Sequence, residues 1–382
     1  MSSIRPYKLS VPQSEIEDLQ QRIRRARWPE AETVEDWSQG VPLAYHREFC
    51  DYWANGYNWY NTQDRLNRHG QFKTVIDDLD IHFFHIKSSV ENATPLIMTH
   101  GWPGSIIEFC KVWEPLAEPE KHGGDASDAF HIVCPSLPGY GFSGKPAKNG
   151  WNVEKIAAAW DELMQRLGYD SYVAQGGDWG SAVTTAIGVQ NRGRCRSIHV
   201  NMPNASATKA ALENPDEADK IALAGARFYQ QWDSGYSKQQ STRPQTLGYG
   251  LSDSPVGQSA WILEKFYQWT DCNGHPENVL SRDELIDNIM FYWLTNAGAS
   301  SARLYWESFG TAFTGADNTV KLPTGISSYP KEIVRTPRSW AEKRYTNIQY
   351  WNDLDKGGHF AAFEQPELFV KEMRNWRRAI AD

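Results

Sequence analysis

The residues best suited to do chemistry form a five-residue turn, Gly176-Gly177-Asp178-Trp179-Gly180. A short β-like run at 172–174 precedes this turn, and a stretch of small residues that can start a helix, 181–187, follows it. Small flanking residues permit a strained strand-to-helix turn that lifts one side chain into a pocket. The lifted side chain is here the carboxylate of Asp178, which we therefore predict to be a nucleophile. An aspartate that only caps the following helix would give the same five letters.

Two further segments favour the nucleophile. The first, His100-Gly101-Trp102-Pro103, follows an apolar run at 95–99. Backbone N–H groups in such a loop, together with the N–H just after a nucleophile, can stabilise an oxyanion. We expect Trp102 and Trp179 to supply this oxyanion hole. His100 is expected to hold the loop by hydrogen bonds.

The second segment is Gly357-Gly358-His359-Phe360, which comes after the last predicted strand and before the last predicted helix. Enzymes of the α/β-hydrolase fold place their catalytic histidine there, in the chain order nucleophile, acid, histidine. The position predicts His359 as the base.

The acid that orients His359 should follow a strand end. Glu332 lies just beyond the predicted strand 325–329, whereas the rival position after strand 197–201 holds Asn201 and no acid. Asp353 and Asp355 are closer to His359 in the sequence, but they lie on its own loop. Glu332 is the favoured acid.

An aspartate nucleophile restricts the bonds that the site can break. Carboxylates are ionised at neutral pH, so Asp178 needs no base to deprotonate it. Its attack on an ester gives only a reactive anhydride, whereas attack on an sp³ carbon with a leaving group or a strained ring gives a stable ester. His359 then activates the water that hydrolyses this ester. Haloalkanes and epoxides both fit, and a non-catalytic ligand receptor with the same fold is a third alternative.

The leaving group separates the two substrate classes. A halide needs weak N–H donors, and Trp102 and Trp179 are candidates to line such a site. An epoxide oxygen needs an acid, and a tyrosine phenol suits this task. Several tyrosines lie in the predicted helical insertion: Tyr229, Tyr236, Tyr249, Tyr267, Tyr292 and Tyr305. Packing explains any one of them, so the residues alone leave both classes open.

A scaffold must hold these groups at one sheet edge. Apolar runs alternate with helical patterns along the chain, with strands expected at 95–99, 130–135, 172–174, 197–201, 325–329 and 348–351 and helices at 153–167 and 365–379. This alternation predicts an α/β protein with a mostly parallel central sheet flanked by helices. The strand rhythm stops over the insertion, where helical patterns at 212–232, 255–269 and 282–306 predict a lid.

The N-terminal part is predicted to wrap this body as an arm. It contains an amphipathic helix at 13–28 that Pro29 ends, then a Trp/Tyr-rich meander, then a hairpin with strands 72–76 and 81–86 around a turn at 77–80. The predicted units are therefore the arm at 1–93, the core at 94–203 with 321–382, and the lid at 204–320.

These motifs carry a resemblance to a known family. The chain resembles the microsomal-type epoxide hydrolases over nearly its full length, through residues 27–29, 100–105, 176–180, 246–257, 357–362 and 364–367. The resemblance implies the α/β-hydrolase fold and an enzyme of detoxification that turns a small-molecule epoxide and water into a vicinal diol, without cofactor or metal.

The same resemblance implies a role for each candidate residue. Asp178 is the nucleophile, Glu332 and His359 are the charge-relay pair, and Tyr236 and Tyr305 are the ring-opening donors. Trp102 and Trp179 are expected to contact substrate as well as to form the oxyanion hole.

Composition limits partners and compartment. The net charge of -8 argues against a nucleic acid or an anionic membrane as partner. Five scattered cysteines without CxxC spacing fit a reducing compartment. No signal peptide and no apolar window of ~20 residues are present in the sequence. We expect a cytoplasmic protein, similar to the soluble rather than the membrane-anchored members of the family, and a homodimer is compatible with the sequence.

Overall fold

The computed structural model describes residues 3–313 and 318–380. Within these ranges the centre is a nine-stranded sheet with the order β1-β2-β3-β5-β4-β6-β7-β8-β9. The strands are β1 (Arg5–Pro6), β2 (Gln71–Ile76), β3 (Leu79–Ile86), β4 (Thr94–Thr99), β5 (Phe130–Pro135), β6 (Tyr172–Gly176), β7 (Cys195–Val200), β8 (Thr324–Ser328) and β9 (Ile348–Asp353). The strands from β5 to β9 pair in parallel, whereas β1, β2 and β3 add an antiparallel edge. The predicted fold class is confirmed.

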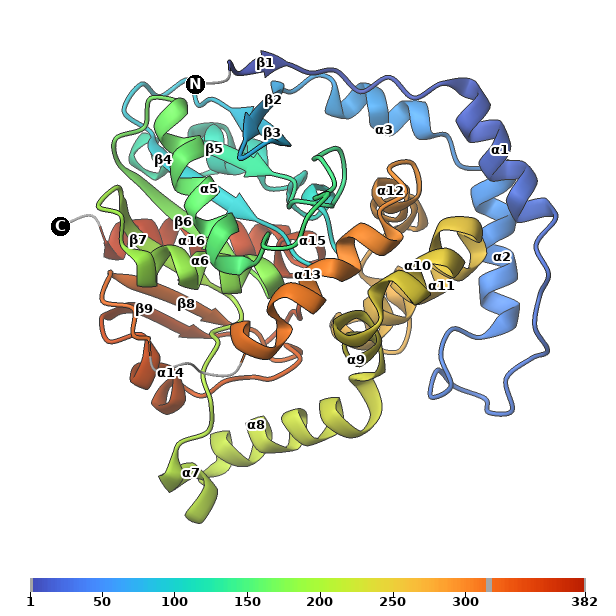
Figure 1. Cartoon of the computed structure of the whole chain (residues 1–382). Coiled ribbons are helices and arrows are strands. Elements are labelled where there is room, and N and C mark those ends of the chain that lie inside the picture. The colour runs from blue at the N-terminus through green and yellow to red at the C-terminus, as the bar shows by residue number, and fades with distance from the viewer. Residues whose placement is uncertain (1–2, 314–317, 381–382) are drawn as a thin grey trace.

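Helices cover both faces of this sheet. In Figure 1, α5 and α6 lie in front of the sheet and α16 lies behind it. The flanking helices are α4 (Trp113–Ala117), α5 (Val153–Arg166), α6 (Asp178–Gln190), α14 (Arg338–Arg344), α15 (Ala361–Glu364) and α16 (Pro366–Ala379). The central strands β4, β6 and β8 are almost entirely buried, since both of their faces are covered.

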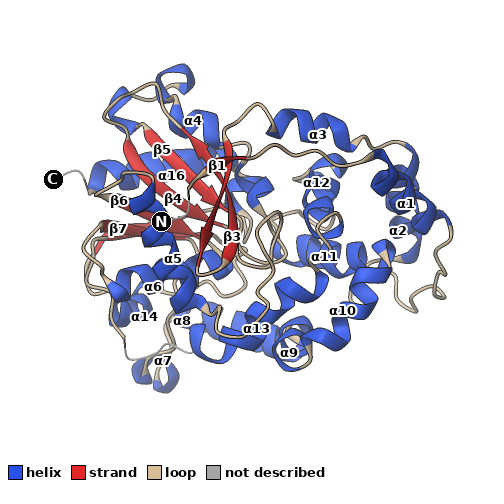
Figure 2. Ribbon diagram, turned by 45° about the horizontal axis from the view of Figure 1, so that its top comes forward, coloured by secondary structure: helices blue, strands red, loops and turns tan. Residues whose placement is uncertain are grey.

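Seven α-helices lie between β7 and β8 in the described part of the insertion. They are α7 (Lys209–Glu213), α8 (Glu217–Phe228), α9 (Gly235–Thr242), α10 (Pro244–Asp253), α11 (Pro255–Trp269), α12 (Arg282–Trp293) and α13 (Gly298–Ala312). Figure 2 shows that α9 to α13 and the arm helices form a helical half beside the sheet, whereas α7 and α8 lie below the sheet near α14. The predicted lid residues 314–317 lie outside the described residues.

Two of the predicted lid helices are each broken in the structure. The stretch expected at 212–232 divides into α7 and α8, because Pro215 interrupts it, and continues as a π-helical turn over Tyr229–Asp233. The stretch expected at 282–306 divides into α12 and α13. Asn296 adopts a left-handed backbone conformation between them, with φ of 50°.

The arm also differs from its sequence-based description. Its first helix, α1 (Gln13–Arg24), ends four residues earlier than expected. It ends one residue after Ile23, the last of its buried residues. The expected meander contains two helices, α2 (Leu43–Asn55) and α3 (Trp59–Leu66). They pack on the lid, where the Tyr57 hydroxyl donates to Asp287 at 2.6 Å and Arg65 pairs with the same carboxylate at 2.7 Å. The arm therefore braces the lid (Figure 1).

The hairpin is tighter than predicted. β2 and β3 pair from Gln71 with Phe84 to Ile76 with Leu79, which leaves a turn of two residues, Asp77 and Asp78. Both have positive φ values, 47° and 61°, as a two-residue hairpin turn requires.

Among the described residues, no helix is both long enough and apolar enough to cross a bilayer.

Candidate active site

Asp178 occupies a strained corner between β6 and α6. Its φ is +51°, a conformation that a residue with a side chain rarely adopts. The glycines on either side make the corner possible, because a Cβ on Gly176 would lie 2.1 Å from the Gly180 carbonyl oxygen. A Cβ on Gly180 would lie 1.8 Å from the carbonyl oxygen of Thr99 on β4. The corner therefore needs glycine at both positions, as expected for a strand-to-helix turn that presents one side chain.

The loop after β4 faces this corner. The backbone N–H of Trp102 donates to Asp178 Oδ1 at 2.7 Å. The approach is so close that a Cβ on Gly101 would lie 2.1 Å from the same oxygen. His100 is buried and accepts a hydrogen bond from the Leu137 N–H at Nε2, 3.1 Å away, so Nδ1 carries the proton and donates to the Gly101 carbonyl at 3.0 Å. These bonds hold the loop in place.

His359 lies between two carboxylates. Its Nδ1 donates to Glu332 Oε1 at 2.5 Å, and its Nε2 lies 3.3 Å from Asp178 Oδ2. The side chain is 1% exposed, so the pair is shielded from water. Burial lowers the pKa of His359, but the charges of Glu332 and Asp178 outweigh burial and raise this pKa well above its usual value.

The alternative acids lie elsewhere. Asp353 is on the surface, where it accepts a hydrogen bond from Trp351 Nε1 at 2.8 Å, and Asp355 is exposed. Asn201 is buried and its side-chain oxygen accepts from Gln175 at 3.1 Å. Of the acidic positions considered in the sequence, the structure brings Glu332 to His359.

Two lid tyrosines reach the same place. Tyr236 on α9 and Tyr305 on α13 are 6% and 2% exposed, and their ring centroids are 5.8 Å apart. The hydroxyl of Tyr229 lies 3.2 Å from that of Tyr236. Burial raises the pKa of both Tyr236 and Tyr305 well above 10, and the nearby negative charge of Asp178 adds to this shift. Both are therefore neutral phenols that can donate a proton.

The geometry can be compared with known proteins. A family model described as "Epoxide hydrolase N terminus" matches residues 4–109, and one for the alpha/beta hydrolase fold matches residues 94–270. A Stigmatella aurantiaca protein that is provisionally named an epoxide hydrolase is 52% identical over 99% of this chain and 85% of its own length. The chain belongs to the epoxide hydrolase family.

Further relatives and solved structures agree with this membership. Epoxide hydrolase 1 of Sus scrofa is 36% identical to this protein, over 98% of this chain and 88% of its own length. The crystal structure of juvenile hormone epoxide hydrolase from Bombyx mori superimposes with a TM-score of 0.91 at 31% identity, over 100% of this chain and 95% of its own. The Aspergillus niger epoxide hydrolase structure gives 0.89 at 30% identity, over 99% and 97%. The chain is an enzyme with the α/β-hydrolase fold.

A cavity of about 380 Å³ opens beside the candidate residues of this epoxide hydrolase. Asp178, Tyr236 and Tyr305 supply polar groups to its wall. Much of the remaining wall is apolar, with contributions from Leu223, Ala226, Phe309, Phe313, Val334 and Trp340. The cavity therefore suits a lipophilic molecule that carries one reactive polar group.

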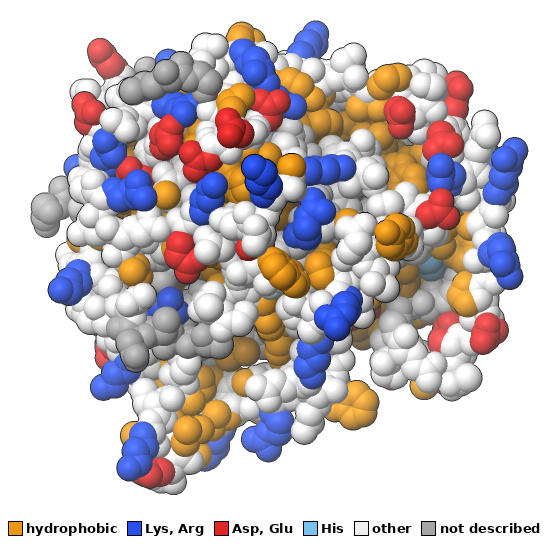
Figure 3. Space-filling model, in the orientation of Figure 1, with side chains coloured by type: hydrophobic (Ala, Val, Ile, Leu, Met, Phe, Trp, Pro, Cys, Tyr) orange, Lys and Arg blue, Asp and Glu red, His pale blue; other side chains and the backbone are white. Residues whose placement is uncertain are grey.

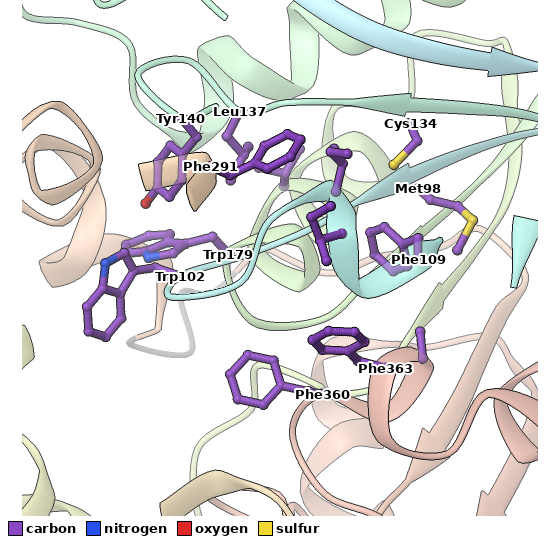
Figure 4. Close-up of a cluster of buried hydrophobic side chains, with 14 of the residues drawn as sticks. Met98, Trp102, Phe109, Cys134, Leu137, Tyr140, Trp179, Phe291, Phe360 and Phe363 are labelled. Carbon is purple, nitrogen blue, oxygen red and sulfur yellow. The ribbon is translucent and has the colours of Figure 1, made fainter. Parts of the chain in front are cut away.

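The two indoles expected to bind substrate lie behind the tyrosines. Trp102 stacks on Tyr236 with centroids 4.8 Å apart and planes 7° apart, and Trp179 meets Tyr305 edge-on at 4.8 Å. Neither indole is among the described side chains that line the cavity. Figure 4 shows both of them within the buried aromatic cluster. Their indoles support the tyrosines, and their predicted substrate contacts stay a prediction.

Sequence reasoning missed several residues that support this site. The backbone carbonyl of Trp269, the last residue of α11, accepts a hydrogen bond from the backbone N–H of His359 at 2.9 Å. The indole ring of Trp269 also lies near the imidazole, with ring centroids 5.0 Å apart. Glu364 accepts the N–H of Phe360 at 3.2 Å and so holds the histidine loop. Glu108 is half-buried and interacts electrostatically with His359 and Asp178, and desolvation raises its pKa to about 8. Glu364 stands in a motif of the family resemblance, whereas no local pattern marks Trp269 or Glu108.

Proposed function

We propose that this enzyme converts epoxides into vicinal diols through a covalent ester on Asp178. One observation carries the proposal: a carboxylate at the corner after β6 and two neutral buried phenols line one apolar cavity, and a histidine–glutamate pair contacts that carboxylate from behind the cavity wall. The names of the relatives support the same reaction.

In the first step, Asp178 attacks a ring carbon. Its Oδ1 is held by the Trp102 N–H and its Oδ2 faces His359, so Oδ2 is the oxygen that forms the new C–O bond. The ring C–O bond breaks, and Tyr236 or Tyr305 gives its proton to the departing oxygen and becomes a phenolate. Two donors share this task, and neither needs a metal ion.

In the second step, water hydrolyses the ester. His359 takes a proton from water as the hydroxide adds to the Asp178 carbonyl carbon, and Glu332 stabilises the imidazolium. The Trp102 N–H already contacts Oδ1, which becomes the oxyanion, and the Trp179 N–H is the expected second donor. The diol leaves with the proton of His359, and the proton of the restored Asp178 carboxyl returns to the phenolate. The sum is one epoxide plus one water to one diol.

The cavity indicates the class of epoxide. Its largely apolar wall favours lipophilic epoxides over charged or sugar-like ones. Among the relatives are juvenile hormone epoxide hydrolases of insects. We take styrene oxide as the probe because it is small and apolar.

Isotope labelling tests the covalent mechanism. A single turnover of styrene oxide with excess enzyme in ¹⁸O-labelled water should leave the label in Asp178 and give unlabelled diol, because the second diol oxygen comes from the carboxylate. Label found directly in the diol would contradict the proposal. Halide release from a chloroalkane without diol from styrene oxide would support a dehalogenase instead.

A further inference from the structure

A buried lysine stands behind one of the two proposed proton donors. Lys265 on α11 has a side chain that is 4% exposed, and its Nζ lies 2.6 Å from Asp233 Oδ1 and 2.8 Å from Glu264 Oε2. The side chain of Asp233 is 5% exposed, and its other oxygen accepts from Trp269 Nε1 at 2.6 Å. Buried ion pairs of this kind are often no more stabilising than apolar residues of similar volume. A contribution to folding stability is therefore a weak explanation for a buried lysine at position 265.

The ammonium group is aimed at the ring of Tyr236. Nζ lies 4.7 Å from the centroid of this ring and 5.4 Å from that of Trp269. The stacked indole of Trp102 already covers one face of the tyrosine ring. The phenol ring of Tyr236 is therefore in contact with both an indole and a cation.

This arrangement links the phenol to the nucleophile. The backbone N–H of Trp102 holds Asp178 Oδ1, while the indole of the same residue stacks on Tyr236. Asp233 ends the turn that leads into α9, so its ion pair with Lys265 ties α9 to α11. The orientation of the Tyr236 ring relative to Asp178 is thus set by contacts with both Trp102 and Lys265.

The charge has a second consequence. A phenol that donates its proton in a buried site leaves a phenolate, and burial makes this anion costly. A cation over the ring face attracts the negative charge of the π-system, and this attraction grows when the ring becomes an anion. An interaction that strengthens as the reaction proceeds lowers the barrier.

We propose that Lys265 is a positioning residue for Tyr236: it clamps the ring against Trp102 and stabilises the phenolate that forms when Tyr236 protonates the opening epoxide. The inference rests on the proposed function, since it concerns the proton donor of the alkylation step.

A double-mutant cycle with styrene oxide tests the inference. Single-turnover rates of alkyl-enzyme formation and of its hydrolysis are measured by quenching and intact-protein mass. Lys265→Met should slow alkylation by about 10-fold in the wild-type background, and at least as much in Tyr305→Phe, where Tyr236 is the sole donor. In the Tyr236→Phe background, Lys265→Met should change the alkylation rate by less than about 2-fold, because the hydroxyl that Lys265 positions is absent. Hydrolysis of the ester should be unchanged in each case.

Two companion variants guard against a simple folding defect. Lys265→Met leaves the buried Asp233 without its cation, so the double variant Lys265→Met/Asp233→Asn removes both charges of the fully buried pair, leaves only the partly exposed Glu264, and should slow alkylation by the same factor. Lys238→Met changes an exposed lysine two residues from Tyr236 and should leave both steps as they are.

The outcomes separate this inference from the proposed function. An equal loss in the Tyr236→Phe background, or no loss in any background, would overturn the inference while the wild type still forms its alkyl-enzyme. A wild type that forms no alkyl-enzyme would overturn the proposed function itself.

Discussion

His359 Nε2 lies 3.3 Å from Asp178 Oδ2, so the proposed base and the proposed nucleophile are in contact before any substrate arrives. The carboxylates of Asp178 and of Glu332, which contacts the other ring nitrogen, raise the pKa of the imidazole. In the mechanism that we propose, Asp178 becomes a neutral ester, so one of these charges disappears and the pKa of His359 falls. The first proposed step would therefore prepare the base for the second.

A pH prediction follows from this contact. Hydrolysis of the ester needs neutral His359, so its rate should rise with pH until the imidazolium has lost its proton. Glu332→Gln removes the remaining negative charge, which lowers the pKa of His359 further and should shift the rise to lower pH. Single-turnover decay of the alkyl-enzyme between pH 5 and pH 10 checks the direction. A shift to higher pH would show that Glu332 does not stabilise the imidazolium.

Loss of His359 should separate the two steps. His359→Gln keeps Asp178 as an ionised nucleophile but removes the base, so we expect one equivalent of styrene oxide to add to the protein and stay there. Intact mass should show the adduct, and peptide mapping should locate it on Asp178. The matched control His122→Gln changes an exposed histidine and should turn over normally. Normal cycling of His359→Gln would exclude this residue as the water-activating base.

The two phenols should act in parallel. General acid catalysis contributes 10²- to 10⁴-fold, so Tyr236→Phe and Tyr305→Phe should each slow alkylation by about 10- to 100-fold, and the double variant should lose nearly all of it. Ester hydrolysis in the single variants should change far less, because neither phenol takes part in the attack of water. If the double variant still opens styrene oxide at the wild-type rate, the proton comes from another group.

How far the sequence predicts this site depends on how local each signal is. Asp178 and His359 stand in short glycine-containing turns, and Glu332 follows a strand end, so neighbouring residues identify them. Tyr236 and Tyr305 lie on different lid helices without such a turn, and only the family resemblance singled them out. Lys265 acts through contacts that the folding of the lid creates, and no periodicity reveals them. The lid helix breaks were missed for the opposite reason: Pro215 and Asn296 interrupt patterns whose hydrophobic spacing continues across them.

Figure 3 shows where the lid meets solvent. Hydrophobic side chains are exposed on the lower part of this face, where α8 lies in Figure 1. Ile221 and Phe228 on α8 are 50% and 46% exposed, and Trp232 in the π-helical turn that follows is 79% exposed. The opposite face of the same helix contributes Leu223 and Ala226 to the cavity wall. Only one side of α8 is therefore needed to shape the cavity.

Glycine at position 101 should be needed for chemistry rather than for folding. An added methyl group would lie 2.1 Å from Asp178 Oδ1, so Gly101→Ala must push the carboxylate aside. A displacement of about 1 Å can cost 10²-fold, and we expect alkylation to slow by at least about this factor. The control Gly250→Ala, in α10, meets open space and should leave the rate unchanged. Equal activity of both variants would contradict the close approach of the loop.

The last prediction concerns stability. Glu108 is half-buried, with one carboxylate oxygen fully buried and without a hydrogen-bond partner among the described residues, and this desolvation raises its pKa from 4.5 to about 8. The unfolded chain therefore binds fewer protons at this residue than the folded chain between these two values, so its ionisation lowers the free energy of unfolding as pH rises. The slope approaches about 1.4 kcal/mol per pH unit within this window and vanishes above it. Glu108→Gln removes this loss because an amide does not ionise.

Urea unfolding at pH 5, 6.5, 8 and 9 checks it, with Glu120→Gln as the control because Glu120 is exposed on the surface. The advantage of Glu108→Gln over the wild type should grow from pH 5 to pH 8 and then level off, whereas the control should follow the wild type throughout. A difference that shrinks as pH rises would mean that the folded protein favours the ionised form of Glu108. The loop after β4 would then stabilise this carboxylate by more than desolvation destabilises it.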